Sequence, residues 1–135
     1  MEFQSGTILG ISELALWVTD LDRAIRFYVE NLGFTVEDHD PGHNAFLKSG
    51  DLLLALFVPE DPGTRLATEY LSRVGSPRGG VYHVGFRIDP AGLDAASTSL
   101  REKGISVSGP VEFVGGRRSY FLEDLDQHYI ELTDR

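Results

Sequence analysis

The chain has 135 residues, of which 21 are acidic and 12 basic, so its formal net charge at pH 7 is −9. A chain of this length is expected to form one compact domain or two small halves of one. The negative charge argues against nucleic acid and anionic membranes as partners, because both bind basic surfaces. The absence of cysteine excludes disulfides, thiolate metal sites and a cysteine nucleophile.

The hydrophobic pattern indicates a protein that works in water. No apolar run approaches the ~20 residues of a membrane span. The first residues have neither the basic region nor the apolar core of a signal peptide. We therefore expect a cytoplasmic protein whose partner is a small molecule, with no nucleic acid and no membrane bound.

Residues 11–58 are predicted to form a strand, a helix and three further strands. Alternation of apolar and polar residues predicts the strands, and an apolar stripe at helical spacing, closed by Gly33, predicts the helix. The predicted strands cover residues 11–18, 34–38, 44–48 and 52–58, and the predicted helix covers residues 21–32. Residues 59–81 are rich in proline and glycine at both ends and are interpreted as a linker.

Residues 82–134 repeat the same order of elements. Asp89-Pro90 is a typical helix start, and Gly104 is expected to end that helix. Gly109-Pro110 is expected to break the strand before it. The predicted strands cover residues 82–88, 105–108, 119–123 and 128–133, with an irregular extension at residues 111–114.

The strand at residues 82–88 is the most informative stretch. Its alternation places apolar side chains toward a core and His83, Gly85 and Arg87 on the opposite face. The chain also contains this stretch twice, because ELAL at 13–16 aligns with HVGF at 83–86 at an offset of 70. We therefore predict an α+β fold, in which two βαβββ modules pair their mostly antiparallel sheets into one curved cup with the helices outside. This would be a single domain over residues 1–135.

The whole chain resembles the vicinal oxygen chelate superfamily, which includes glyoxalase I, bleomycin-resistance proteins, extradiol dioxygenases and fosfomycin-resistance transferases. The matching pieces are WVTDLDRA at 17–24, FY at 27–28, LG at 32–33, HVGF at 83–86, YFLED at 120–124 and IEL at 130–132. In addition, GGRRS at 115–119 is similar to the Gly-Gly-Arg-Ser stretch of one subgroup, and DLDQH at 124–128 replaces the usual Asp-Pro-x-Gly-Asn turn.

The resemblance implies a metal site. Metal ligands in this superfamily come from the first strand of each half and the last strand of the second, which implies Glu13, His83 and Glu131 here. Glu13 is a departure, because histidine is more usual at that position. Strand parity places all three side chains opposite the core face. Two carboxylates held close together would repel one another unless a cation or a shared proton lies between them.

One histidine and two carboxylates suit a single divalent ion, either Mn²⁺, Fe²⁺, Ni²⁺, Zn²⁺ or Mg²⁺. Three protein ligands leave positions open for water or substrate. Histidine must be neutral to ligate, so metal affinity should fall in acid. No catalytic residue is assigned. The candidate substrate-binding residues are Trp17, Arg87, Arg118, Tyr120 and Tyr129, with Arg87 and Arg118 as candidates for an anionic substrate group.

Three functions are compatible with this pattern. The first is a metal-dependent lyase, isomerase or group-transfer enzyme acting on a small oxygenated metabolite. The second is a non-enzymatic protein that binds an antibiotic or similar small molecule, and the third is a dioxygenase. The apolar run at residues 52–57 also predicts a homodimer. Its modules could pair within one chain or be exchanged between chains.

Overall fold

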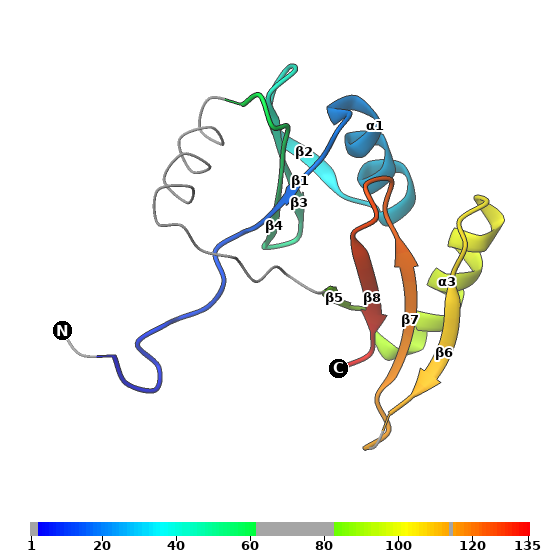
Figure 1. Ribbon diagram of the computed structural model, residues 1–135. Coiled ribbons are helices and arrows are strands. Elements are labelled where there is room, and N and C mark those ends of the chain that lie inside the picture. The colour runs from blue at the N-terminus through cyan, green and yellow to red at the C-terminus, as the bar shows by residue number, and fades with distance from the viewer. Residues whose placement is uncertain (1–2, 62–82, 114) are drawn as a thin grey trace, which may run out of the picture. The chain divides into compact units, whose positions relative to one another are not determined.

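The computed structural model describes residues 3–61, 83–113 and 115–135. The chain divides into two compact units, Met1–Thr68 and Glu69–Arg135 (Figure 1). Each unit contains one four-stranded sheet and helical segments. The division after Thr68 falls inside the predicted linker at residues 59–81, most of which lies outside the described residues.

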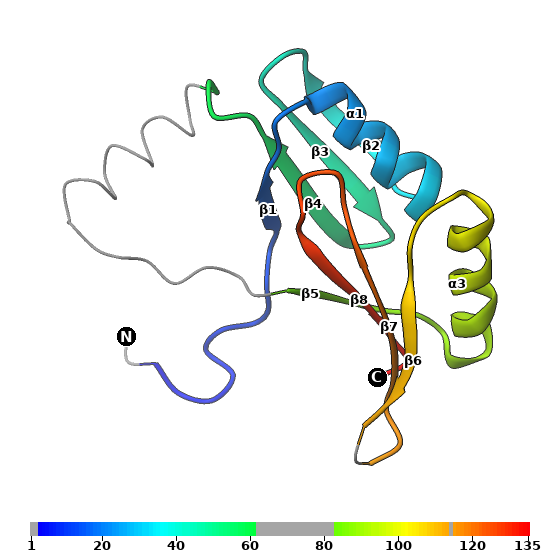
Figure 2. The same cartoon turned by 45° about the vertical axis from the view of Figure 1, so that its right-hand side comes forward.

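The first unit is a βαβββ module. Its sheet has the strand order β1-β4-β3-β2, in which β1 runs parallel to β4 and the other neighbours are antiparallel. Helix α1 continues into a π-helical turn and contacts β3 and β4 (Figure 2). Asp20 caps the helix, because its side chain accepts a hydrogen bond from the Arg23 amide. The elements are β1 Leu14–Trp17, α1 Leu21–Arg26, η1 Phe27–Asn31, β2 Thr35–Asp40, β3 Asn44–Ser49 and β4 Leu52–Phe57.

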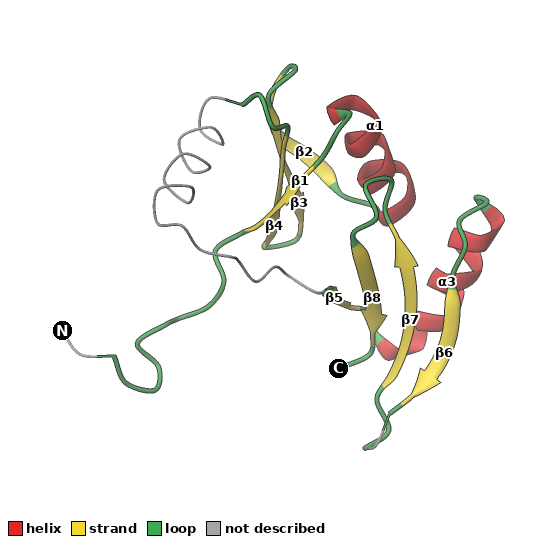
Figure 3. Cartoon of the chain, in the orientation of Figure 1, coloured by secondary structure: helices red, strands yellow, loops and turns green. Residues whose placement is uncertain are grey.

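The second unit repeats this topology. Its strand order is β5-β8-β7-β6, again with one parallel pair, β5 and β8 (Figure 3). Asp89 accepts a hydrogen bond from the Ala91 amide at the predicted helix start, and Pro90 occupies the first turn. The elements are β5 Val84–Arg87, η2 Pro90–Gly92, α3 Leu93–Glu102, β6 Ser108–Glu112, β7 Arg118–Glu123 and β8 Tyr129–Thr133.

The internal repeat and the α+β fold class are confirmed. Leu14 pairs with Leu54 in the parallel pair of the first unit, and Val84 pairs with Ile130 in the parallel pair of the second. The same registers place Ala55 opposite Ala15 and Glu131 opposite Gly85. The first module therefore has an alanine at the position equivalent to Glu131.

The predicted strand at residues 105–108 is wrong in its position. Strand β6 begins at Ser108 and runs through Gly109 and Pro110 to Glu112. Proline is tolerated because β6 is the edge strand and needs no donor on its outer side. The register with β7 also shifts between Ser108 and Val111, which accommodates the irregular segment. This pairing is a tertiary effect that overrides the local break signal.

One face of each sheet carries most of the buried apolar side chains, as strand parity predicts. The buried apolar side chains are Leu16, Ala45, Leu47, Leu54 and Leu56 from the first sheet and Tyr120, Leu122, Ile130 and Leu132 from the second. The opposite faces differ in chemistry. In the first unit, that face carries Phe46 and Phe57. Their rings are packed edge to face, with 5.8 Å between the ring centres. In the second unit, it carries Ser119 and Glu131, which are both buried although they are polar.

Within the described parts of the chain, no helix is long and apolar enough to cross a membrane.

Candidate functional site

A pocket of about 380 Å³ opens on the second sheet, on the face opposite α3. Pockets of small-molecule sites typically begin near this size. The register places Phe121 beside Glu131, and Ser119 beside Thr133, on this face. The pocket is lined by His83, Phe113, Arg117, Phe121, Tyr129 and Glu131. It therefore combines three aromatic rings with an imidazole, a guanidinium and a carboxylate.

Glu131 lies at the centre of the polar contacts in this pocket. Only 3% of its side chain is exposed. Its Oε2 accepts hydrogen bonds from the Ser119 hydroxyl at 2.6 Å and from Nη2 of Arg117 at 2.7 Å. Its Oε1 lies 3.1 Å from Nε2 of His83. One carboxylate oxygen is thus anchored by the protein, and the other faces the histidine.

These contacts keep Glu131 ionised. Burial by itself raises the pKa of the carboxyl group, because it disfavours the charged form. The Ser119 hydroxyl, the Arg117 guanidinium and His83 outweigh burial and hold the pKa of Glu131 below its ordinary value. A charged carboxylate is the form that ligates a metal ion or accepts hydrogen bonds from a ligand.

Arg117 is a pocket residue that the sequence interpretation missed. Its Nε donates to Oγ1 of Thr133 at 3.0 Å, and its guanidinium lies 5.7 Å from the centre of the Phe113 ring. A tight turn fixes this approach, because the Phe113 amide donates to the Arg117 carbonyl. The sequence contained only part of the signal: Arg117 has the parity of Ser119 and Phe121, but the glycine turn before it leaves open whether strand parity extends that far.

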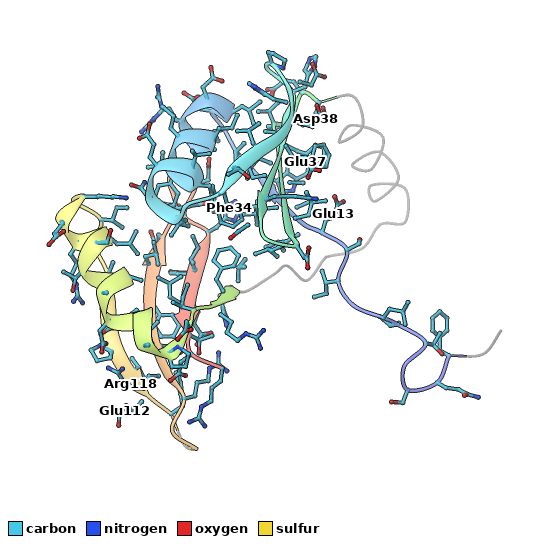
Figure 4. All side chains as sticks on the ribbon, turned by 180° about the vertical axis from the view of Figure 1, so that it is seen from behind. Glu13, Phe34, Glu37, Asp38, Glu112 and Arg118 are labelled. Atoms are coloured by element: carbon cyan, nitrogen blue, oxygen red, sulfur yellow. The ribbon has the colours of Figure 1, made fainter. Side chains whose placement is uncertain are left out.

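Arg118 and Tyr120 project from the other face of β7. Both hold Asp94 of α3: Nη2 of Arg118 donates at 3.0 Å and the Tyr120 hydroxyl at 2.5 Å. The Arg118 hydrogen bond, followed by that of Tyr120, lowers the pKa of Asp94. Arg118 also lies 3.8 Å from Glu112 of the neighbouring strand (Figure 4). Arg118 and Tyr120 were predicted to bind substrate. The structure places these two residues in the contact between α3 and β7, and neither lines the pocket.

The remaining predicted residues are divided between the two units. Tyr129 lines the pocket. Arg87 shares the His83 face of β5 by parity but is not a lining residue. Trp17 and Glu13 belong to the first unit, where Glu13 is exposed directly before β1 (Figure 4). Of the three predicted metal ligands, the second unit brings together two, His83 and Glu131.

The His83–Glu131 pair has the spacing expected of two ligands of one metal ion. Two ligand atoms bound to one ion at about 2.0–2.2 Å lie roughly 3.0–3.4 Å apart, and the observed separation is 3.1 Å. Ser119 and Arg117 hold the outer oxygen of the carboxylate, as partners of metal-ligating carboxylates commonly do. Among the described residues, no three histidine, aspartate or glutamate side chains form a metal-binding group. A metal site at this pair therefore requires a third protein ligand from elsewhere in the chain.

Comparisons with known proteins agree with this fold. A lactoylglutathione lyase from Agrobacterium tumefaciens is 27% identical, with a TM-score of 0.71, and the alignment covers 92% of each chain. A glyoxalase/dioxygenase from Nostoc punctiforme is 25% identical, with a TM-score of 0.72, over 98% of this chain and 95% of the other. The fosfomycin resistance protein FosX from Listeria monocytogenes, in a mutant form complexed with Mn(II) and 1S,2S-dihydroxypropylphosphonic acid, is 19% identical. Its TM-score is 0.71, over 95% of this chain and 91% of the other.

No curated protein matches the sequence significantly. The model of one protein family, by contrast, matches residues 10–132, which is nearly the whole chain. The chain therefore belongs to the Glyoxalase/Bleomycin resistance protein/Dioxygenase superfamily.

Proposed function

We propose that this protein is a divalent-metal-dependent enzyme of lyase, isomerase or group-transfer type that acts on a small oxygenated metabolite. Glu13, His83 and Glu131 would hold the ion. The observation that carries the proposal is the geometry of Glu131: its Oε2 is anchored by two donors while its Oε1 lies 3.1 Å from the imidazole nitrogen. A buried carboxylate prepared in this way presents one oxygen for ligation.

Different residues would have different roles in such a metal site. His83 and Glu131 supply the nitrogen and oxygen donors from the second unit, and Glu13 would supply the third donor. The chemistry gained from a divalent ion is polarisation of a ligand oxygen and stabilisation of developing negative charge. Phe113, Phe121 and Tyr129 provide apolar walls for the carbon skeleton of a ligand. The lactoylglutathione lyase with 27% identity supports an enzyme of lyase type.

A second candidate function is binding without catalysis, and one observation favours it. Arg117 already places a cation on Glu131, so the buried carboxylate is charge-balanced by the protein itself. Three aromatic rings line the same pocket, which suits an aromatic drug-like ligand. In this case the pocket would hold its ligand without a metal ion.

Metal analysis distinguishes the two functions. Protein purified without chelator should carry about one divalent ion per chain, identified by mass spectrometry as Mn, Fe, Ni, Zn or Mg. Replacing His83 by Ala should remove most of the bound metal, because it deletes one of three ligands. It should leave the fold intact, since His83 is on the face opposite the core. His39→Ala is the matched control, because His39 is an exposed histidine on β2.

Equal metal content in wild type and His83→Ala would contradict the proposed metal site. Circular dichroism checks that both variants fold. If wild type itself carries no stoichiometric metal, the binding function takes precedence, and Glu13 is then a solvated surface residue.

A further inference from the structure

We propose that Arg117 makes the pocket selective for a small anionic ligand, which it binds through the guanidinium edge that faces away from Glu131. The proposal rests on the proposed function, because it names the ligand class of the same pocket. It assigns the anion-binding role to Arg117, in place of the expected Arg87 and Arg118.

The hydrogen bonds of Arg117 use only one edge of its guanidinium. Nε donates to Thr133 and Nη2 donates to Glu131, and these two contacts occupy the Nε–Nη2 edge. A guanidinium has five N–H donors, so three remain. Within the described residues, these three have no protein acceptor. They include both donors of Nη1, so the Nη1–Nη2 edge can bind a carboxylate or phosphate in bidentate fashion.

The guanidinium is held in place before any ligand arrives. Thr133 and Glu131 fix it from one side, and the Phe113 ring lies 5.7 Å from its central carbon. Its side chain is still 42% exposed, so a ligand can reach it. A cation that is preorganised and accessible loses little entropy when it binds an anion.

The charges of the site favour a single negative charge on the ligand. With the proposed ion bound, two carboxylates, one guanidinium and one divalent cation sum to +1, because His83 must be neutral to ligate. A monoanion would bring the loaded site to neutrality. The guanidinium and the imidazole contact the two oxygens of the same carboxylate, and both residues line the same pocket, so a ligand held by the outward edge of Arg117 occupies the pocket that His83 also lines.

Two probes of the same shape test the selectivity. Mandelate carries a carboxylate next to a hydroxyl, and 1-phenyl-1,2-ethanediol carries two hydroxyls on the same phenyl body. Calorimetric titration of Mn²⁺-loaded wild type should show tighter binding of mandelate than of the diol. Arg117→Gln should weaken mandelate binding by about 10- to 100-fold, the range expected for hydrogen bonds to a charged group. It should leave binding of the diol unchanged.

Two further variants control the experiment. Arg118→Gln removes the same charge one residue along the chain, on the other face of the sheet, and should bind mandelate as wild type does. Arg117→Lys keeps a positive charge beside Glu131 but lacks the second guanidinium edge, so it should also bind mandelate more weakly than wild type. It serves as the test variant if Arg117→Gln loses its metal or its fold.

The proposal is overturned if wild type shows no preference for mandelate, or if the variants at position 117 bind it as tightly as wild type does at equal metal content. Manganese content is measured separately, and wild type without stoichiometric manganese would contradict the proposed function. The anion site is then tested in the ion-free protein, where Arg117→Gln should still weaken mandelate binding.

Discussion

Ser119→Ala tests how strongly the protein itself holds the buried carboxylate of Glu131. The Ser119 side chain is fully buried, and its hydroxyl donates to Oε2 of Glu131 at 2.6 Å. Hydrogen bonds to a charged group contribute about 1.5–3 kcal/mol to stability. The substitution deletes this bond and leaves Arg117 as the other donor to the same oxygen. Because Arg117 still donates to this oxygen, the loss should not reach the upper end of that range. We therefore expect the free energy of unfolding to fall by about 1.5–2.5 kcal/mol.

The loss is large enough to measure by urea or thermal denaturation. Unfolding entropy of about 2.1 cal/mol/K per residue, for 135 residues, makes 1 kcal/mol equivalent to roughly 3–4 °C in Tm. The expected decrease in Tm is therefore roughly 5–9 °C. Ser108→Ala is the matched control, because Ser108 is an exposed serine of β6 in the same sheet. Its effect should stay within about 0.5 kcal/mol.

A double-mutant cycle assigns the effect to the Ser119–Glu131 pair. In a Glu131→Gln background, Ser119→Ala should cost less than in wild type, because the charge that strengthens the bond is gone. A loss of less than about 0.5 kcal/mol for Ser119→Ala in wild type would refute the reasoning. Equal losses in both backgrounds would refute it as well, since the hydroxyl would then not act through the carboxylate.

Three further predictions concern the contact between α3 and the sheet, the oligomeric state, and the exchange of modules between chains. The folded-state pKa of Asp94 is lowered, so the stability it contributes is present above its unfolded pKa of ~3.9 and is lost as the pH falls through the lower folded value. The difference in unfolding free energy between wild type and Asp94→Asn should therefore be constant above about pH 5 and shrink below about pH 4; a difference independent of pH would contradict the ion pair with Arg118. Light scattering should give about twice the chain mass of 14.9 kDa, and a monomer mass at micromolar concentration would contradict the predicted dimer. Equal mixing of Glu13→Ala with His83→Ala should restore one of the two sites in each mixed dimer, about a quarter of all metal sites, if modules are exchanged between chains and none if they pair within one chain.

The sequence alone was sufficient for the order of elements in each module and for the shared face of His83 and Glu131. Side chains alternate between the two faces of a strand, so a short stretch of residues determines which of them share a face. This local rule correctly placed His83 and Glu131 opposite the buried Ile130 and Leu132. The offset of 70 between the two halves likewise predicted that Leu14 and Val84 lie in equivalent strands, and each of them is in the parallel pair of its unit.

Only the tertiary structure decided which of two neighbouring arginines enters the pocket. Arg117 and Arg118 follow a glycine turn, and the face of each depends on where β7 begins and how it pairs with β8. The pairing of Phe121 with Glu131 and of Ser119 with Thr133 sets that register. These contacts join residues distant in the chain, so no local pattern contains them. For the same reason β6 could start at Ser108 and run through Pro110: pairing with β7 outweighed the local preference for a break. The sequence thus determined the faces of the strands, and long-range register determined which side chains meet around Glu131.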